Sequence, residues 1–345
     1  MKVAVLWPMG ARDQAGLGQF LARGFEVLGH TCYAAPIVEH DPWTVEGRLR
    51  LHRRFESAYL GRRIAEIRQE LLRRDVALVV IIKGVALGHD LVEELRPGRN
   101  VPVVSFMPDS PLHLIHPNLN VKAIESLLSY DLVVTFAKVF LPVYEQMGIS
   151  RVIRIPFAYD PLTHRPVKLE GGDVQVFSSK VSYAGNTGPL QQRWMDALAG
   201  YQPKCFGADW DKAPRVERAL RRFRGYERYR KSLRGFGAEL TKVCAGAQVM
   251  LNLVRAEHDC AHSMKTFELP ACGACVVTNR TDEQEEFFQE GVKFFRSQGE
   301  LIEHVERLLA DEKEREKLRN AALKEVARHT YEARALDLLQ HLGMD

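Results

Sequence analysis

The sequence predicts an α/β protein with two doubly wound parallel sheets, one after the other along the chain. Short apolar, β-rich runs alternate with helical patterns through both halves, which is the order of repeated βαβ units. Residues 158–173 interrupt this alternation with prolines, glycines and no periodic apolar residues, so we expect a linker there. The length of 345 residues also fits about two domains of roughly 150 residues each.

The first half begins with the apolar strand 2–7, a loop containing glycines, and a helical pattern that closes at Gly29. A long arginine-rich helix over 46–74 and a helical stretch around 120–129 connect later strands. The run at 77–84 is apolar almost throughout, which is typical of a strand buried on both faces. The remaining strands of this half are expected at 31–37, 101–110, 130–136 and 151–157.

The second half repeats the alternation after residue 173. Strands are expected at 174–186, 203–210, 249–254, 275–279 and 293–297. Helices are expected around 189–200, from about 265, over 282–289, and as two charged helices from 299 to about 342.

Composition excludes several classes of protein. Hydrophobic residues make up 46% and charged residues 27% of the chain, which excludes disordered and fibrous proteins. No long apolar stretch lacks a charge, so we expect no transmembrane helix, and we interpret the apolar start as a strand rather than a signal peptide. Six cysteines are too sparse for a disulfide scaffold, which predicts a cytoplasmic protein.

Most of the excess positive charge lies in residues 212–234, which hold ten Lys/Arg against two Glu. One interpretation is a solvated helix face that packs through Tyr226 and Tyr229. The other is a contact surface for phosphate groups, which leaves nucleic acid open as a partner.

A loop with Gly10, Gly16 and Gly18 follows the first strand. Glycines there allow the backbone to approach a ligand, and the next helix offers its N-terminus to an anion. The loop lacks a complete dinucleotide fingerprint, since Leu21 occupies the third glycine position. A tight turn without a ligand is therefore the alternative.

Cysteine and histidine spacing raises the possibility of a zinc site at Cys260, His262, Cys272 and Cys275. Zinc-dependent deaminases need a glutamate two residues after the histidine, and Met264 stands there. Small buried cysteines are the commoner use of such residues. We therefore expect no metal.

Lys265 and Glu268 lie at the start of a predicted helix that follows a loop. A cation and a helix start suit a diphosphate, and a carboxylate one turn further can accept two hydrogen bonds from vicinal hydroxyls such as those of ribose. The alternative is a surface Lys–Glu pair that contributes little.

Several segments, in the same order along the chain, resemble the CgeB-like family of glycosyltransferase-related proteins, which includes a spore-maturation protein. The run MKTFELPACGACVVTN, the acidic helix after it and the tail HTYEARALDLL are similar to the C-terminal domain of GT-B glycosyltransferases. The supporting segments are FMPDSPLHL (106–114), RIPFAYDPLTHRP (154–166), VSYAGN (181–186) and AQVMLNLVR (247–255).

The resemblance implies two Rossmann-like domains facing a central cleft that holds a nucleotide-sugar donor. It divides the chain into an acceptor-side domain at 1–160, a linker at 161–173, a donor domain at 174–325, and a C-terminal helix at 326–345 that packs on the first domain. It implies hexosyltransferase-like transfer from a nucleotide-diphosphate sugar to an acceptor hydroxyl, similar to retaining relatives, with no cofactor and no bound metal.

By the same resemblance, Glu268 binds the donor ribose and Lys265 neutralises the leaving diphosphate. Relatives often carry a second glutamate eight residues before the first, where this chain has Cys260. The candidates to replace it are His258, Asp259 and His262. The other donor-binding candidates are Gly16, Gly18, Gly185, Asn186, Arg193, Ser263 and Thr266.

On the acceptor side, Asp109 follows a predicted strand, where α/β sheets place ligands, and it could orient or deprotonate an acceptor hydroxyl. His113 and His116 are nearby alternatives, and Asp109 could instead cap the next helix. The missing second glutamate leaves a second function open: a non-catalytic nucleotide-sugar-binding or assembly protein on the same fold.

Overall fold

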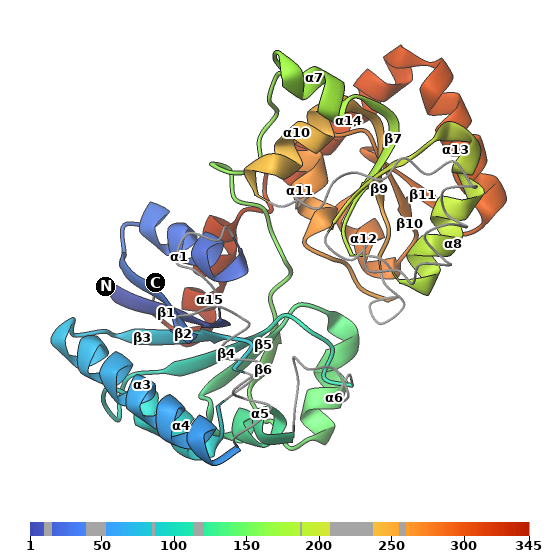
Figure 1. The fold of residues 1–345 in the computed structure, drawn as a ribbon. Helices are drawn as coiled ribbons and strands as arrows, with labels where there is room; N and C mark the ends of the chain where they lie inside the picture. The colour runs from blue at the N-terminus through green and yellow to red at the C-terminus, as the bar shows by residue number, and fades with distance from the viewer. Residues whose placement is uncertain are drawn as a thin grey trace. The chain divides into compact units, whose positions relative to one another are not determined.

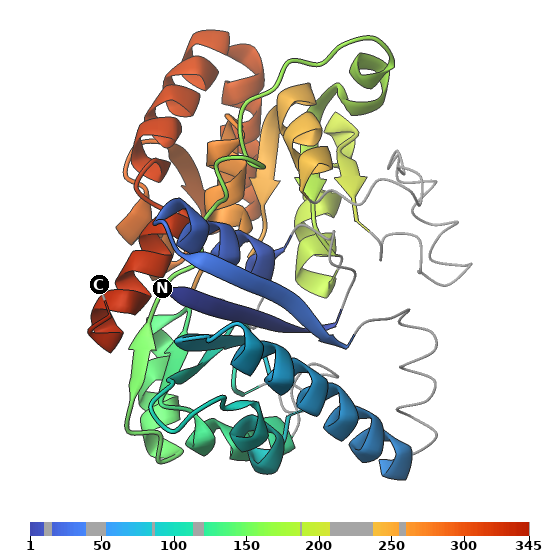
Figure 2. The same ribbon diagram turned by 90° about the vertical axis from the view of Figure 1, so that its left-hand side faces the viewer.

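The computed structural model describes residues 1–9, 16–38, 53–84, 87–112, 121–186, 188–207, 237–254 and 260–344. The chain forms two compact units (Figure 1). Unit 1 comprises Met1–Pro156 and Tyr331–Asp345, and unit 2 comprises Phe157–Thr330. Both chain termini therefore lie in unit 1 (Figure 2).

Unit 1 contains a six-stranded parallel sheet in the order β2-β1-β3-β4-β5-β6. The three strands β3, β4 and β5 are buried at every residue, which explains their largely apolar sequences. The strands are β1 (Lys2–Met9), β2 (Thr31–Val38), β3 (Leu78–Ile82), β4 (Val103–Met107), β5 (Leu132–Thr135) and β6 (Val152–Arg154). The helices are α1 (Leu17–Val27), α3 (Arg53–Arg73), α4 (His89–Leu95), α5 (Val121–Glu125), α6 (Leu141–Gln146) and α15 (Tyr331–Leu342).

The C-terminal helix α15 packs against α1 within unit 1 (Figure 1). The rings of Phe20 and Tyr331 lie 5.7 Å apart between the two helices. Gly24 lets the helices approach, because a Cβ atom at this position would overlap the backbone carbonyl of Tyr331.

Replacing Gly24 by alanine is therefore expected to lower the free energy of unfolding, because α15 must shift. Overpacking of this kind typically costs about 1–3 kcal/mol. Gly61 in α3 is the matched control, since a Cβ there meets nothing within 4 Å. Gly61→Ala should stabilise the protein by up to about 1 kcal/mol through helix propensity. Denaturant unfolding of both variants measures the difference, and equal stabilities would contradict this packing.

Unit 2 contains a five-stranded parallel sheet in the order β11-β10-β9-β7-β8. Its core joins the strands to the helices that cover them, through residues such as Leu251, Val277 and Leu301. The strands are β7 (Ser179–Ala184), β8 (Lys204–Phe206), β9 (Ala247–Asn252), β10 (Val276–Asn279) and β11 (Val292–Phe295). The helices are α7 (Gly172–Phe177), α8 (Pro189–Ala197), α10 (Ala238–Gly246), α11 (Lys265–Ala271), α12 (Asp282–Phe287), α13 (Gln298–Ala310) and α14 (Glu312–Val326).

Two predicted elements were wrong in detail. The strand expected at 174–186 is a short helix, α7, followed by β7, and the ring of Phe177 at the end of α7 stacks on Phe206 of β8. The two charged helices expected after residue 299 are three, because Asp311 ends α13 and caps α14 by accepting a hydrogen bond from the Glu314 backbone N–H (3.0 Å).

The order of the strands reverses once in each sheet, and the position where it reverses is called the switch point. In unit 1 the chain turns from one side of β1 to the other, which leaves a switch point between β1 and β3. In unit 2 the corresponding point lies between β7 and β9. Ligands of open α/β sheets bind beyond the carboxyl ends of the strands at such points.

Candidate functional site

The loop before α11 is fixed to the carboxyl end of β9 by Asn252, the last residue of that strand. The Asn252 side-chain amide donates to Thr266 Oγ1 (3.2 Å), and its carbonyl oxygen accepts from Ser263 Oγ (3.3 Å). Thr266 Oγ1 also accepts from the Ser263 backbone N–H (3.2 Å). The first turn of α11 is therefore held at the switch point of unit 2.

Gln284 of α12, which the sequence analysis did not single out, completes this buried network. Its Oε1 accepts from Asn252 Nδ2 (2.9 Å), Thr266 Oγ1 (3.2 Å) and Thr278 Oγ1 (3.0 Å). Its Nε2 donates to the carbonyl oxygen of Asn279 (2.8 Å). A buried network whose members have partners is rigid, so it fixes α11 against the ends of β9 and β10.

Glu268 lies one turn into α11, between two basic side chains. Lys265 Nζ lies 2.7 Å from Glu268 Oε2, and His164 Nε2 lies 3.6 Å from Glu268 Oε1. The Glu268 side chain is only 4% exposed, whereas that of Lys265 is 15% exposed. Burial raises the pKa of Glu268, but the charges of Lys265 and His164 outweigh it, so the net direction is down.

His164 was missed because it falls in the segment interpreted as a linker. That segment belongs to unit 2, and both Asp160 and His164 are buried there. His164 Nδ1 accepts from the Asp160 backbone N–H (3.1 Å), which directs the other ring nitrogen toward Glu268. A histidine between two prolines in a polar segment was the available signal.

Two predicted donor-binding residues have polar groups that already bond to other groups of the protein. His262 is fully buried, its Nδ1 lies 2.7 Å from Glu283 Oε2, and its Nε2 accepts from the Phe157 backbone N–H (3.1 Å). The Gly185 backbone N–H, expected to face a diphosphate, donates to the carbonyl oxygen of Phe206 (2.8 Å). In this structure these groups bond within unit 2, and their donor-binding role stays a prediction.

The remaining predicted site residues of unit 2 differ in how far they are exposed to solvent. Asn186 and Ser263 are half-buried near the switch point, whereas Thr266 is buried in the network around Asn252. Arg193 is exposed on α8, and its guanidinium lies 6.0 Å from the centroid of the Trp194 ring.

The zinc alternative finds no support in this geometry. Cys272 and Cys275 are buried, Cys260 is exposed, and the ring nitrogens of His262 have protein partners. Across the ranges that the structure describes, no three His, Cys, Asp or Glu side chains gather as a metal site would require.

In unit 1, Asp109 follows β4, and its Oδ2 lies 2.6 Å from Lys83 Nζ. Lys83 directly follows β3 and was not singled out from the sequence. Gly16 is half-buried at the N-cap of α1, and Gly18 is buried against Trp7, where a Cβ would lie 2.7 Å from the ring. Gly18 therefore lets Trp7 pack closely, and its role in donor binding stays a prediction.

Other candidates lie outside the described residues. They are Gly10, His113, His116, His258, Asp259 and the basic stretch 212–234. No helix in the described part of the chain is both long and apolar enough to cross a bilayer.

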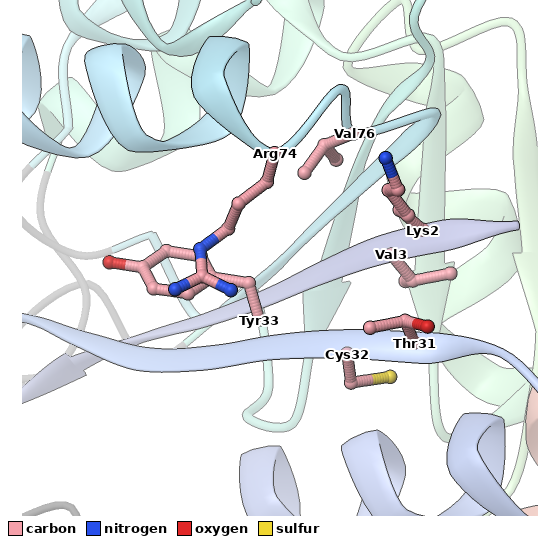
Figure 3. A pocket seen from close by; sticks show the side chains of 7 residues that line it. All are labelled: Lys2, Val3, Thr31, Cys32, Tyr33, Arg74 and Val76. Carbon is pink, nitrogen blue, oxygen red and sulfur yellow. The ribbon is translucent and has the colours of Figure 1, made fainter.

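A pocket of about 220 Å³ lies elsewhere in unit 1 (Figure 3). It is lined by residues at the amino ends of β1 and β2 and just before β3, and the Arg74 guanidinium lies 4.9 Å from the centroid of the Tyr33 ring. This is the sheet edge opposite to the one where α/β folds bind ligands, and the pocket shares no residue with the candidate site. We do not assign the activity to it.

Residues 189–340 match a family model described as glycosyl transferase-like. This match covers α11 and the network around it. A comparison with curated protein sequences finds no significant match.

Solved structures resemble the chain over nearly its whole length. A sucrose-phosphate synthase from Thermosynechococcus elongatus is 15% identical with a TM-score of 0.67, covering 99% of this chain and 98% of that one. Anabaena HepE, in complex with UDP-glucose, is 14% identical with a TM-score of 0.65, covering 99% of both chains. The chain has the GT-B fold.

Another GT-B structure, an alpha-glucosyltransferase in complex with UDP and a 13-mer DNA, is 12% identical with a TM-score of 0.64 over the full length of both chains. The fold predicted from the sequence is thus confirmed.

Proposed function

We propose that this protein is a glycosyltransferase that moves a sugar from a nucleotide-diphosphate sugar to an acceptor hydroxyl, with retention of configuration. The observation that carries the proposal is the Lys265–Glu268–His164 cluster near the switch point of unit 2. Support comes from the GT-B fold, the glycosyl transferase-like match over 189–340 and a neighbour crystallised with UDP-glucose. The ordered motifs further support placement in the CgeB-like branch, and cysteine usage a cytoplasmic location.

Glu268 would hold the donor ribose. An ionised carboxylate has about four lone-pair sites, so Glu268 keeps acceptor capacity beyond its contacts with Lys265 and His164. The lowered pKa keeps it ionised at neutral pH, as an acceptor of two ribose hydroxyls must be.

Lys265 would stabilise the negative charge that develops on the departing nucleoside diphosphate. Its side chain is the more exposed member of the pair and is held in place by Glu268. A preorganised cation at that position supplies transition-state stabilisation without a bound metal. Ser263 and Asn186 lie near the same strand ends and add a hydroxyl and an amide.

Asp109 would orient or deprotonate the acceptor hydroxyl from the carboxyl end of β4. Asp109 lies at a bend, and the residues after it that the structure describes, 110–112, are not helical.

One observation favours the binding-protein alternative. The position expected to carry a second glutamate holds Cys260, which is exposed and offers no carboxylate to the transferred sugar. A binding protein would hold the nucleotide sugar without releasing nucleoside diphosphate, so turnover separates the two functions.

Thermal unfolding of the full chain with UDP, GDP, ADP, dTDP, CMP and their sugars, with and without magnesium, tests the donor site. We expect one nucleotide to raise the Tm independently of metal, since ligand at 100 times its Kd stabilises by about 2.7 kcal/mol. No shift with any nucleotide would contradict the proposal.

A further inference from the structure

Unit 1 has a switch point of its own, between β1 and β3. The rule that places the donor near β7 and β9 in unit 2 applies equally to the carboxyl ends of these strands. Lys83 is the first residue after β3, and Asp109 follows the neighbouring strand β4. Both side chains therefore lie at the ligand-binding edge of the unit 1 sheet.

Lys83 has a backbone conformation that lysine rarely adopts. Its φ is +71°, and that of Gly84 is +43°. The other non-glycine residues with positive φ in the described ranges, Asp75 and Gln202, lie in surface segments just after helices, whereas Lys83 directly follows a central strand. Backbone strain of this kind persists where the surrounding structure enforces it, and it gathers at functional sites.

The surrounding structure does enforce this conformation. The Lys83 backbone N–H donates to the carbonyl oxygen of Phe106 in β4 (2.8 Å). At Gly84 a Cβ atom would lie 2.8 Å from the hydroxyl oxygen of Tyr130, so a larger residue would clash there. The turn is thus held on both sides, and the Lys83 ammonium at this turn contacts Asp109.

The Lys83–Asp109 pair remains accessible. Lys83 Nζ lies 2.6 Å from Asp109 Oδ2, and the side chains are 21% and 35% exposed. Asp109 Oδ2 itself is buried, whereas other atoms of both side chains are open to solvent, where a ligand can reach them.

Two buried hydroxyl groups lie on elements next to the pair. Tyr144 of α6 and Thr135 at the end of β5 are fully buried, and neither hydroxyl has a hydrogen-bond partner in the described part of the chain. Burial, and after it the charge of Asp109, raises the pKa of Tyr144. Polar groups of this kind are usually satisfied by water or a ligand.

We propose that Lys83 and Asp109 form a binding site for an uncharged polyhydroxy compound, a sugar or polyol, and that Lys83 determines this specificity. Each hydroxyl of such a ligand can accept from an ammonium and donate to a carboxylate, which matches a cation and an anion side by side. A phosphate group would be attracted by Lys83 and repelled by Asp109, so the pair, which carries no net charge, gives it no net electrostatic gain. The inference rests on the proposed function, in which this ligand is the acceptor.

Saturation-transfer NMR on the full chain tests the site, with glucose, galactose, mannose and maltose as neutral probes and glucose 6-phosphate as the charged probe. We expect at least one neutral sugar to bind the wild type, and Lys83→Met to weaken it about tenfold through loss of a charged hydrogen bond. Asp109→Asn, which keeps the shape, should weaken the same sugar. The matched control is Lys242→Met, which breaks an exposed ion pair in unit 2 (Lys242–Asp173, 2.7 Å) and should change nothing.

Three outcomes would each overturn the proposal. They are equal sugar binding by Lys83→Met and wild type, no binding of any neutral sugar, and a preference for glucose 6-phosphate. Nucleotide-induced Tm shifts on the same samples separate this proposal from the donor proposal. Loss of sugar binding in Lys83→Met with an unchanged nucleotide shift supports both. If sugar binding depends on Lys83 but no nucleotide raises the Tm, the result supports the Lys83–Asp109 site and contradicts the proposed function.

Discussion

Glu268→Ala is expected to weaken nucleotide-sugar binding by about 100-fold, or two steps of about 1.4 kcal/mol. The reason is the loss of charge-assisted hydrogen bonds to the ribose, each of which contributes about 1.5–3 kcal/mol. The substitution also leaves Lys265 and His164 without their carboxylate, so the free energy of unfolding should fall. Calorimetric titration with the nucleotide that raises the Tm measures the affinity.

A second variant and a second ligand keep this test independent of folding. Glu268→Gln preserves the shape and should retain the fold while losing most of the affinity. Wild type should prefer the ribonucleotide over its 2′-deoxy form, and Glu268→Ala should not discriminate. Glu285→Ala is the control, because Glu285 lies in a partly exposed ion pair with Arg280 in the same unit. Unchanged affinity in both Glu268 variants would remove the ribose role.

Lys265→Met is expected to reduce kcat by about 10²–10³-fold with a smaller effect on donor affinity, since Lys265 acts where charge develops. The same variant should change the pH dependence of donor binding. Burial alone raises the pKa of Glu268, and Lys265 is the first of the groups that lower it. Donor binding needs the ionised carboxylate, so its loss at acidic pH should begin at a higher pH in the variant than in the wild type.

Kinetics and calorimetry across pH 4–8 measure both effects. Lys242→Met again serves as control, because its ion pair with Asp173 is exposed and neither residue hydrogen-bonds to the network around Asn252 in the described part of the chain. A variant with wild-type kcat would contradict the electrostatic role of Lys265. If the variant lost donor binding at a lower pH than the wild type, the charge coupling between Lys265 and Glu268 would be contradicted.

The fold could be predicted from the sequence because apolar strand runs and helical periodicity are both local patterns. Runs such as 77–84 are apolar almost throughout, and a strand buried on both faces requires this composition. The helix α7 (Gly172–Phe177) was missed because six residues are too few to distinguish a period of two from one of 3.6. The break at Asp311 was missed because a capping aspartate in a charged run resembles its neighbours.

The candidate site was only partly predictable because it depends on partners distant in sequence. The Lys265–Glu268 pair follows from helical spacing, and the structure shows it. His164 reaches Glu268 from more than a hundred residues away, and no local pattern indicates this. The same limit explains His262, whose ring nitrogens are taken by Phe157 and Glu283. Lys83 had a local signal, a lysine and a glycine closing an apolar strand, but its backbone conformation is visible only in the structure.

Release of nucleoside diphosphate tests the central claim most directly. The full chain would be incubated with nucleotide sugars, EDTA and a panel of neutral sugar acceptors, and the diphosphate and glycoside products would be quantified together. The proposed function predicts release with one donor, a new glycoside in equal amount, and loss of both in Glu268→Ala and Lys265→Met. A donor that binds with wild-type protein but releases no diphosphate with any acceptor would contradict catalysis and favour a nucleotide-sugar-binding protein.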